Sequence, residues 1–281
     1  MKSFGIYSNP VKDKGFKNAI RIAGILEGKG IPYSVDLQMK EAFPEVPLTD
    51  DMRPDVMLIL GGDGTVLSAA RKYAPLGALL LGINLGRLGF LLETEMEQAE
   101  AAIERVLKGE YQVEKRIMLK AEVINAAGEK SSGSLALNDA VISRKRILRM
   151  IDLSVSINGV QADRFVADGV IVSTPTGSTG YSLSAGGPIV WPGLDVLLIT
   201  PISPHRLSSK SMVISKNDEL EIVWAHDDEG ALLTLDGQDS VELMPGDRIR
   251  IGNADRSADF IRFDGWDFYG LLKEKLSEWN S

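Results

Sequence analysis

The segment "DVMLILGGDGTVLSAA" at residues 55–70 restricts the possible folds more than any other part of the chain. A run of apolar residues leads directly into Gly-Gly-Asp-Gly-Thr, and the residues after it have helical spacing. This order is typical of a strand buried on both faces that feeds a crossover helix. We therefore predict a parallel sheet with the glycine-rich turn at the carboxyl end of one strand, where such sheets bind ligands.

Strand-like and helix-like segments alternate on both sides of this turn. They are "SFGIYSN" (3–9), "GFKNAIRIAGILEGKG" (15–30), "PYSVDL" (32–37), "GALLLGIN" (77–84) and "EMEQAEAAIERVLKGE" (95–110). Strand, helix and strand in that order predict a sheet covered by helices. We expect a Rossmann-like α/β domain over residues 1–110.

The apolar period changes to two beyond residue 110. The strand-like segments are "IDLSVSING" (151–159), "DGVIVST" (168–174), "DELEIVWA" (218–225), "GALLTLDGQDSVEL" (230–243) and "DRIRIGNA" (247–254). They predict a mostly β, sandwich-like domain over residues 111–260, and Asp-Gly in "TLDGQDS" predicts a hairpin. Residues 261–281 contain an amphipathic helix that we expect to pack back on the first domain.

Composition excludes several classes of function. The formal net charge is −8 and the chain has no cysteine, so a basic nucleic-acid surface, a membrane surface, disulfides and thiolate chemistry are not expected. The apolar runs are much shorter than the roughly 20 residues that span a bilayer, and the first residues lack a signal pattern. We expect a cytoplasmic protein.

The Gly-Gly-Asp-Gly-Thr turn has the composition of a phosphate site. Glycines 61, 62 and 64 permit positive φ and a close approach of phosphate to backbone N–H groups, and a helix beginning near Thr65 offers its positive end to an anion. Asp63 would repel that phosphate unless it binds a metal ion or accepts a proton from a hydroxyl. The alternative is that Asp63 only caps the helix.

Two familiar phosphate motifs do not fit this turn. Leu67 stands where a dinucleotide fingerprint has its third glycine, and the turn does not follow the first strand. No Gly-Lys-Ser or Gly-Lys-Thr occurs in the chain, which excludes a P-loop.

Two further segments each allow a binding and a structural interpretation. "GINLGRLGFL" (82–91) could line the same cleft or form a tight turn after a strand. Asn138 and Asp139 have the donors and acceptors needed to bind a ribose diol, although Asn-Asp is also a common turn pair.

The segment "STPTGSTGYSLSAGGP" (173–188) carries more hydroxyl groups than a turn requires. A linker is rich in glycine and serine, but it does not usually contain two prolines, a tyrosine and a leucine inside a β-domain. We interpret the segment as an ordered polar wall around a ligand such as a nucleoside with its pyrophosphate. His205 and His226 are interpreted as ordinary structural or surface residues.

Together, "GGDGT", the Asn-Asp pair, "DGVIVSTPTGSTGYSLSAGGPIV" and "TPISPHRLSSK" closely resemble the bacterial NAD kinases over about residues 56–240. The resemblance implies that Asp63 is the catalytic carboxylate, with Gly64 beside it. It also implies a homodimer or homotetramer that binds the nucleotide between domains and near a subunit contact. The substrate-binding residues that it implies are Gly64, Asn138, Asp139, Arg149, Asp168, Thr179, Gly180, Tyr181, Ser182, Leu183, Ser184 and Gln238. Gly61, Gly62 and Thr65 would form the phosphate loop.

Three positions depart from the family pattern. Gly180 stands where the family usually has alanine. Val166 stands where many members have a basic residue, so the charge would have to come from Arg144, Arg146 or Arg149. Lys210 and Ser211 replace the usual Arg-Pro.

We hypothesise transfer of the terminal phosphoryl group of ATP or polyphosphate to the adenosine ribose 2′-hydroxyl of NAD, which gives NADP. Mg²⁺ is the expected cofactor, held mainly by phosphates, and no protein metal ligand is assigned. A lipid or sugar kinase, an NAD-dependent oxidoreductase and a non-catalytic nucleotide sensor are the alternatives. The sequence leaves open the choice of donor, the acceptance of NADH, the form of the assembly and allosteric control.

Overall fold

The computed structural model describes residues 2–86, 89–131, 133–145, 150–206, 209–224, 230–244, 246–265 and 267–278. The chain divides into two compact units. The first contains residues 1–115 and 258–281, and the second contains residues 116–257. The C-terminal segment therefore belongs to the same unit as the N-terminal third of the chain.

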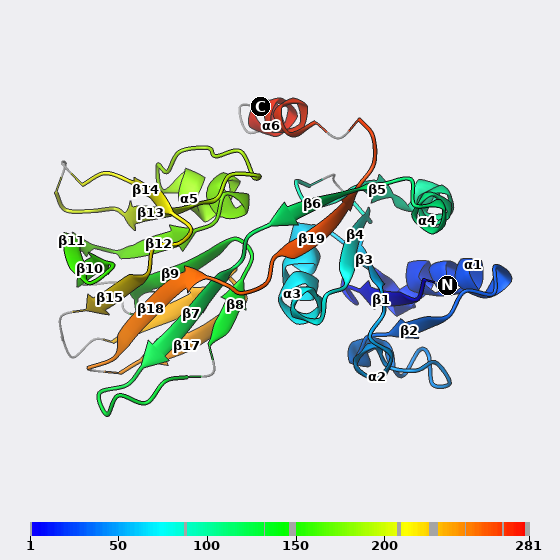
Figure 1. Cartoon of the computed structure of the whole chain (residues 1–281), viewed down its shortest axis with the longest axis horizontal. Coiled ribbons are helices and arrows are strands. Elements are labelled where there is room, and N and C mark those ends of the chain that lie inside the picture. The colour runs from blue at the N-terminus through cyan, green and yellow to red at the C-terminus, as the bar shows by residue number, and fades with distance from the viewer. Residues whose placement is uncertain are drawn as a thin grey trace. The chain divides into compact units, whose positions relative to one another are not determined.

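The first unit is an α/β structure (Figure 1). Its strands are β1 (Phe4–Ser8), β2 (Tyr33–Val35), β3 (Val56–Gly61), β4 (Leu79–Asn84), β5 (Thr94–Glu95), β6 (Gln112–Arg116) and β19 (Ala258–Arg262), in the order β2-β1-β3-β4-β19-β6 with β5 beside β4. Strands β1 to β5 pair in parallel, and β19 pairs in parallel with β4. The predicted parallel sheet is confirmed.

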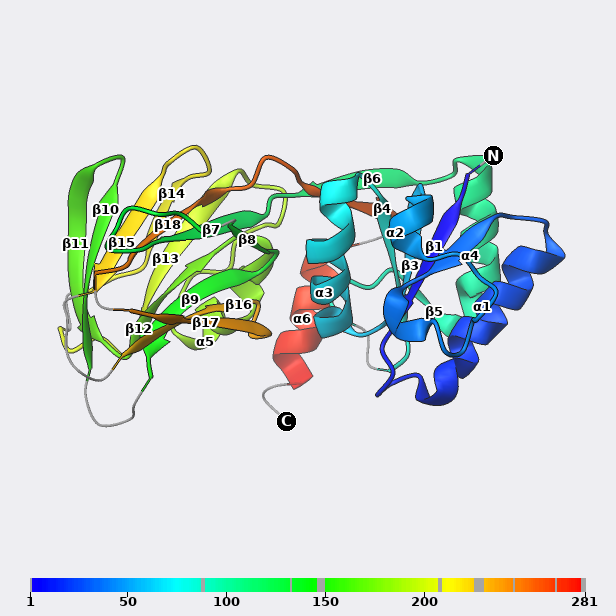
Figure 2. The ribbon, with the colours of Figure 1, turned by 90° about the horizontal axis from the view of Figure 1, so that it is seen from below.

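Helices cover both faces of this sheet. They are α1 (Lys17–Gly28), the short α2 (Thr49–Met52), α3 (Asp63–Tyr73), α4 (Ala99–Lys108) and α6 (Phe268–Glu278). Helix α3 lies on the face opposite α1 and α4 (Figures 1 and 2). Val56, Leu58 and Leu60 of β3 share a buried cluster with apolar residues of α1 and α4. Helix α3 also packs against β3, so the strand is buried along its whole length.

The second unit is built from two antiparallel sheets. One has the order β11-β10-β15-β18-β7-β8 and the other β14-β13-β12-β9-β16-β17. Their strands are β7 (Leu119–Ile124), β8 (Ser134–Ala136), β9 (Asp139–Arg144), β10 (Ile151–Ile157), β11 (Val160–Ala167), β12 (Gly169–Ser173), β13 (Val196–Ile202), β14 (Met212–Ser215), β15 (Leu220–Trp224), β16 (Ala231–Leu235), β17 (Asp239–Leu243) and β18 (Arg248–Asn253).

Alternate residues of the two sheets meet in one apolar core, which includes Leu153 and Val155 from one sheet and Ile142 and Val170 from the other. The predicted sandwich-like architecture is confirmed. A single helical turn, α5 (Tyr181–Ser184), lies in the connection between β12 and β13.

Glycine shapes the ends of two elements, and the predicted hairpin is confirmed. Helix α4 ends before Gly109, whose φ of 77° gives the left-handed C-terminal cap. Asp236 and Gly237 have φ of 50° and 64°, and Gln238 N–H donates to the Leu235 carbonyl at 2.9 Å. Positive φ at both central residues of this turn suits the twist of a hairpin, and the connection between β16 and β17 has three residues, 236–238.

Candidate functional site

The Gly-Gly-Asp-Gly-Thr turn lies at the carboxyl end of β3, as predicted. Helix α3 begins at Asp63 rather than near Thr65. The Thr65 hydroxyl accepts from Gly62 N–H at 3.4 Å, so Thr65 caps the start of the helix instead of beginning it. None of glycines 61, 62 and 64 has positive φ, so the turn does not use the freedom that glycine permits there.

Gly61 is needed for space, and Gly62 lies against a flexible side chain. A Cβ on Gly61 would overlap the Thr65 side chain, and one on Gly62 would overlap the ammonium group of Lys12. Lys12 lies in the loop after β1, and it is a residue that the sequence analysis missed. Its position beside Gly62 places a positive charge at the N-terminus of α3, where backbone N–H groups already favour an anion.

Asp63 does not cap its own helix. Its carboxylate accepts from the backbone N–H of Phe90 at 2.9 Å and of Leu91 at 3.1 Å. These residues follow β4, in the segment that the sequence analysis left open between a cleft and a turn. Gly89 completes the grip, because a Cβ there would overlap the Asp63 carboxylate. A carboxylate offers about four acceptor positions, so, as far as the described residues go, two remain for a ligand.

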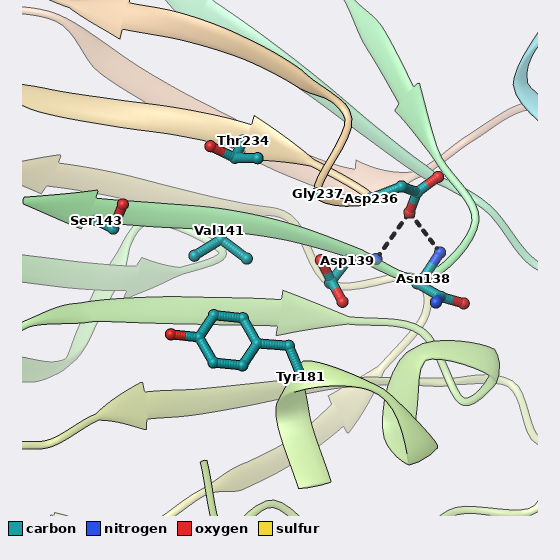
Figure 3. A pocket seen from close by; sticks show the side chains of 8 residues that line it. All are labelled: Asn138, Asp139, Val141, Ser143, Tyr181, Thr234, Asp236 and Gly237. Atoms are coloured by element: carbon teal, nitrogen blue, oxygen red, sulfur yellow. Dashed lines mark hydrogen bonds between the residues drawn. The ribbon is translucent and has the colours of Figure 1, made fainter. Parts of the chain in front are cut away.

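The second unit contains a cavity of about 350 Å³ on the outer face of the β9–β16 sheet (Figure 3). Asp139, Val141 and Ser143 of β9 point outward to it, whereas Ala140 and Ile142 between them point to the core. The remaining lining residues are Asn138, Tyr181, Thr234, Asp236 and Gly237. The structure therefore brings together Asn138, Asp139 and Tyr181 of the residues expected to bind substrate.

Asp139 faces this cavity as a nearly buried carboxylate, with 5% of its surface exposed. Within the described residues no donor reaches its oxygens. Burial, and then the charge of Asp236, raises the pKa of Asp139 to about 7. A ligand hydroxyl that donates to Asp139 would supply the missing partner and favour the ionised carboxylate.

The cavity suits the uncharged part of a nucleotide. Its lining contains two carboxylates, and the described residues that line it include no lysine, arginine or histidine. A phosphate would therefore be repelled. The ring of Tyr181, which is 47% exposed, offers an apolar face for a flat group. Asn138 adds an amide that both donates and accepts.

The threonine-and-serine segment is ordered, but much of its hydroxyl chemistry is internal. The Thr174 hydroxyl donates to the Leu137 carbonyl at 2.6 Å, the Ser178 hydroxyl donates to the Pro175 carbonyl at 2.7 Å, and Thr176 accepts from Arg116 at 3.3 Å. The Ser182 hydroxyl is buried and bonded to Thr200 at 3.0 Å. These hydroxyls therefore brace the segment, and Tyr181 is the residue that it contributes to the cavity.

The other expected site residues do not line this cavity. Asp168 precedes β12 and pairs with Arg144 at 3.2 Å, at the end of β9 farthest from Asp139. Three of them are half-buried, namely Thr179, Gly180 and Leu183. Two are exposed, namely Ser184 and Gln238. Arg149 and Arg146 lie outside the described residues. Of the three arginines that could replace the basic residue absent at Val166, the structure therefore describes Arg144.

Gly180 has little room for the family's usual alanine. A Cβ there would lie 3.3 Å from the Gly177 carbonyl oxygen, so the loop would have to shift slightly. Gly177 itself has no room at all, because the backbone of Asn138 lies against it.

The sequence analysis missed Val141, Ser143, Thr234, Asp236 and Gly237. The alternation along β9 and β16 could have placed the first three on one face. Asp236 was explained fully by its turn, so no local pattern indicated a second role.

Solved structures share the whole architecture. A yeast NADH kinase complexed with NADH has a TM-score of 0.88 and 24% identity, covering 99% of this chain and 88% of that one. An NAD kinase from Archaeoglobus fulgidus in complex with ATP has a TM-score of 0.74 and 28% identity, covering 94% of each chain. The α/β unit and the sandwich unit thus define the fold as that of the NAD(H) kinases.

Sequence comparisons give the family. The ATP-NAD kinase N-terminal domain matches residues 4–111 and the ATP-NAD kinase C-terminal domain matches residues 137–263. The NAD kinase of Symbiobacterium thermophilum is 46% identical over 236 residues, covering 84% of this chain and 82% of that protein. The NAD kinase of Thermoanaerobacter sp. is 39% identical over 283 residues, covering 99% and 100%. The chain belongs to the NAD kinase family.

Proposed function

We propose that the protein transfers the γ-phosphoryl group of ATP to the 2′-hydroxyl of the adenosine ribose of NAD, with Asp63 as the catalytic carboxylate. Membership of the family makes the chain a phosphotransferase that acts on NAD. The role of Asp63 is supported by the hydrogen bonds of its carboxylate. Two backbone N–H groups hold it in place, and within the described residues two acceptor positions stay free.

Asp63 has the geometry of a general base. The ribose hydroxyl would donate to one free acceptor position of the carboxylate, and its proton would pass to Asp63 as the oxygen attacks phosphorus. The new O2′–P bond forms while the bond from the γ-phosphorus to its bridging oxygen breaks, which releases ADP. Phe90 and Leu91 keep the carboxylate in place, so positioning supplies much of the rate.

The donor phosphates would bind at the start of α3. The positive end of α3 would favour an anion beside Gly61, Gly62, Gly64 and Thr65, and Lys12 beside Gly62 adds a positive charge. The described residues contain no group of three carboxylate or histidine side chains that could hold a metal ion. Because Mg²⁺ in kinase sites is usually held by substrate phosphates and water, it would be held mainly in that way here, and it would neutralise charge on the phosphates.

NAD would use the cavity of the second unit for a nucleoside part. Asn138 and Asp139 would bind hydroxyl groups, and Tyr181 would contact a ring. The remaining residues expected from the resemblance, Arg149, Asp168, Thr179, Gly180, Ser182, Leu183, Ser184 and Gln238, stay predictions.

The test combines product formation with binding. NADP is measured by a coupled assay with ATP or polyphosphate as donor, and NAD affinity is measured by calorimetry without a donor. Asp63→Asn should lower kcat by about 10²-fold or more because the amide cannot accept the proton, with NAD affinity roughly unchanged. Asp55→Asn is the matched control, since Asp55 accepts from Ser3 N–H at 2.8 Å in the same unit but away from the turn.

The alternatives give different results in the same assay. A nucleotide sensor would bind NAD without forming NADP, an oxidoreductase would reduce NAD with a hydride donor, and a lipid or sugar kinase would phosphorylate other acceptors. Near-normal turnover by Asp63→Asn would remove the role assigned to that residue.

The cellular location and the assembly are proposals at this stage. No helix in the described ranges is long and apolar enough to cross a bilayer. A cytoplasmic location and a homodimer or homotetramer stay predictions from the sequence.

A further inference from the structure

One carboxylate holds the turn that presents Asn138 and Asp139. Asp236 accepts from the backbone N–H of Leu137 at 3.0 Å, of Asn138 at 2.7 Å and of Asp139 at 3.1 Å; Figure 3 shows the last two bonds. Asp236 is only 8% exposed, so three consecutive amides converge on one buried anion. Bonds of this kind to a charged group are about twice as strong as neutral ones.

Asp236 is itself held firmly. Its own N–H donates to the Asp139 carbonyl at 2.9 Å, and the tight turn between β16 and β17 fixes its φ at 50°. Because the partners are 97–99 residues apart in sequence, the contact ties the start of β9 to the hairpin. The side chains of Asn138 and Asp139 are therefore aimed by a group that belongs to another element.

We propose that Asp236 is a positioning residue for the ligand cavity: it holds Asn138 and Asp139 in binding geometry, and its negative charge sets the pH range in which Asp139 accepts a ligand hydroxyl. The proposal rests on the proposed function, in which this cavity binds a nucleoside part of NAD.

Few other charged groups lie near Asp139 in the part of the chain that the structure describes. Strand β12, which pairs with β9, carries no ionisable side chain. Among the described residues, the other ionisable groups on the elements around Asp139 are Arg144 with its partner Asp168 at the far end of β9, the phenol of Tyr181 on α5, and Arg116, which donates to Thr176. The hairpin adds the exposed Asp239 and Glu242, and Glu242 pairs with Lys145. Burial and Asp236 together raise the pKa of Asp139 to about 7.

The sign of the pH effect follows from the hydroxyl bond. Ionised Asp139 accepts a charge-assisted bond from the ligand hydroxyl, and protonated Asp139 accepts only a weaker neutral one. NAD affinity of the wild type should therefore fall as the pH drops below about 7. Without the charge of Asp236 the pKa of Asp139 would be lower, and the fall in affinity would move to lower pH.

The experiment measures NAD affinity by calorimetry, without a phosphoryl donor, from about pH 5.5 to 8.5. Asp236→Asn should weaken NAD binding by about tenfold at the upper end of this range, because an amide NH₂ cannot accept from the backbone. The difference in affinity between Asp236→Asn and the wild type should be smaller at lower pH, because the fall in NAD affinity on acidification, here called the acid limb, moves to lower pH in the variant. Asp139→Asn should abolish the acid limb.

Asp247→Asn is the matched control. Asp247 is 5% exposed and accepts from Met244 N–H at 2.8 Å, but it does not line the cavity, so both affinity and acid limb should equal those of the wild type. Asp236→Glu keeps the charge and changes the geometry, so it should weaken binding with the limb near its wild-type position.

Four results would overturn the proposal: unchanged affinity in Asp236→Asn, an acid limb that does not move in that variant, a limb that persists in Asp139→Asn, or an equal effect of Asp247→Asn. A wild type that binds no NAD would instead contradict the proposed function. If Asp236→Asn does not fold, the Asp139 carboxyl of the wild type is titrated by ¹³C NMR, with its signal assigned by comparison with Asp139→Asn. A titration midpoint of about 4, the ordinary value for an aspartate, would contradict the proposal.

Discussion

Asp63 shows how one side chain can be fixed from outside its own element. The residue starts α3, but its carboxylate is bonded to two N–H groups of the loop after β4. The absence of a side chain at Gly89 lets that loop approach the carboxylate. Holding the acceptor atoms in one place before the substrate arrives lowers the cost of reaching the reactive geometry.

We predict that Gly89→Ala lowers kcat for NADP formation by about 10²-fold. The added methyl group would occupy the place of the Asp63 carboxylate, so the carboxylate or the loop would have to move and the positioning would be lost. NAD affinity should change little. Gly86→Ala is the control, because a Cβ at Gly86 meets no atom within 4 Å; a similar loss of kcat in that variant would contradict the explanation.

At the scale of elements, the sequence predicted local features well and long-range roles poorly. The β3–α3 turn, the β16–β17 hairpin and the sandwich strands follow from apolar period and turn chemistry. The number of hydroxyls in residues 173–188 says nothing about their direction, and those of Thr174 and Ser182 bond within the protein. Asp236 could not be connected with Asn138, since their contact spans 98 residues.

The connection between β12 and α5 owes part of its order to Thr174. Its hydroxyl donates to the Leu137 carbonyl at 2.6 Å and accepts from Gly177 N–H at 3.2 Å. Both of these partners are buried, so they cannot exchange this bond for water. The same hydroxyl therefore links the segment after β12 to the residues just before Asn138 and Asp139.

We predict that Thr174→Val lowers the free energy of unfolding by about 1–3 kcal/mol, because the isosteric valine leaves two buried backbone groups without this partner. Thr179→Val serves as the comparison, since the Thr179 hydroxyl makes a long bond of 3.4 Å to the Thr176 carbonyl in a half-buried position. Chemical denaturation followed by fluorescence gives both values. Equal losses in the two variants would show that the Thr174 bonds are not special.

At the scale of the whole chain, the C-terminal segment completes the first unit. Strand β19 pairs with β4, and Phe268 of α6 contacts the ring of Phe90, with centroids 6.2 Å apart. Arg262 is 4% exposed; it bonds to Glu93 at 3.0 Å and to Glu114 at 2.7 Å. A single buried guanidinium therefore connects the end of β19 with the segment that follows Phe90 and Leu91.

We predict that Arg262→Met destabilises the first unit by about 3–5 kcal/mol near neutral pH, because the buried carboxylate of Glu93 and the half-buried carboxylate of Glu114 both lose the guanidinium charge. Arg250→Met should cost less than about 1 kcal/mol, since Arg250 is half-exposed and its pairs with Glu219 and Glu221 are near the surface. Chemical denaturation of each variant and of the wild type, repeated at neutral and acid pH, gives the comparison.

The pH dependence of that loss follows from Glu93. Burial already raises the pKa of Glu93, although Phe263 N–H and Arg262 oppose the shift. A carboxyl group whose pKa is higher in the folded than in the unfolded state destabilises the fold as pH rises from the unfolded value, about 4.5, through the folded one. Removing Arg262 raises the folded pKa further, so the destabilisation by Arg262→Met should shrink on acidification toward about pH 5. A loss that is the same at both pH values would mean that packing, rather than charge, sets the role of Arg262.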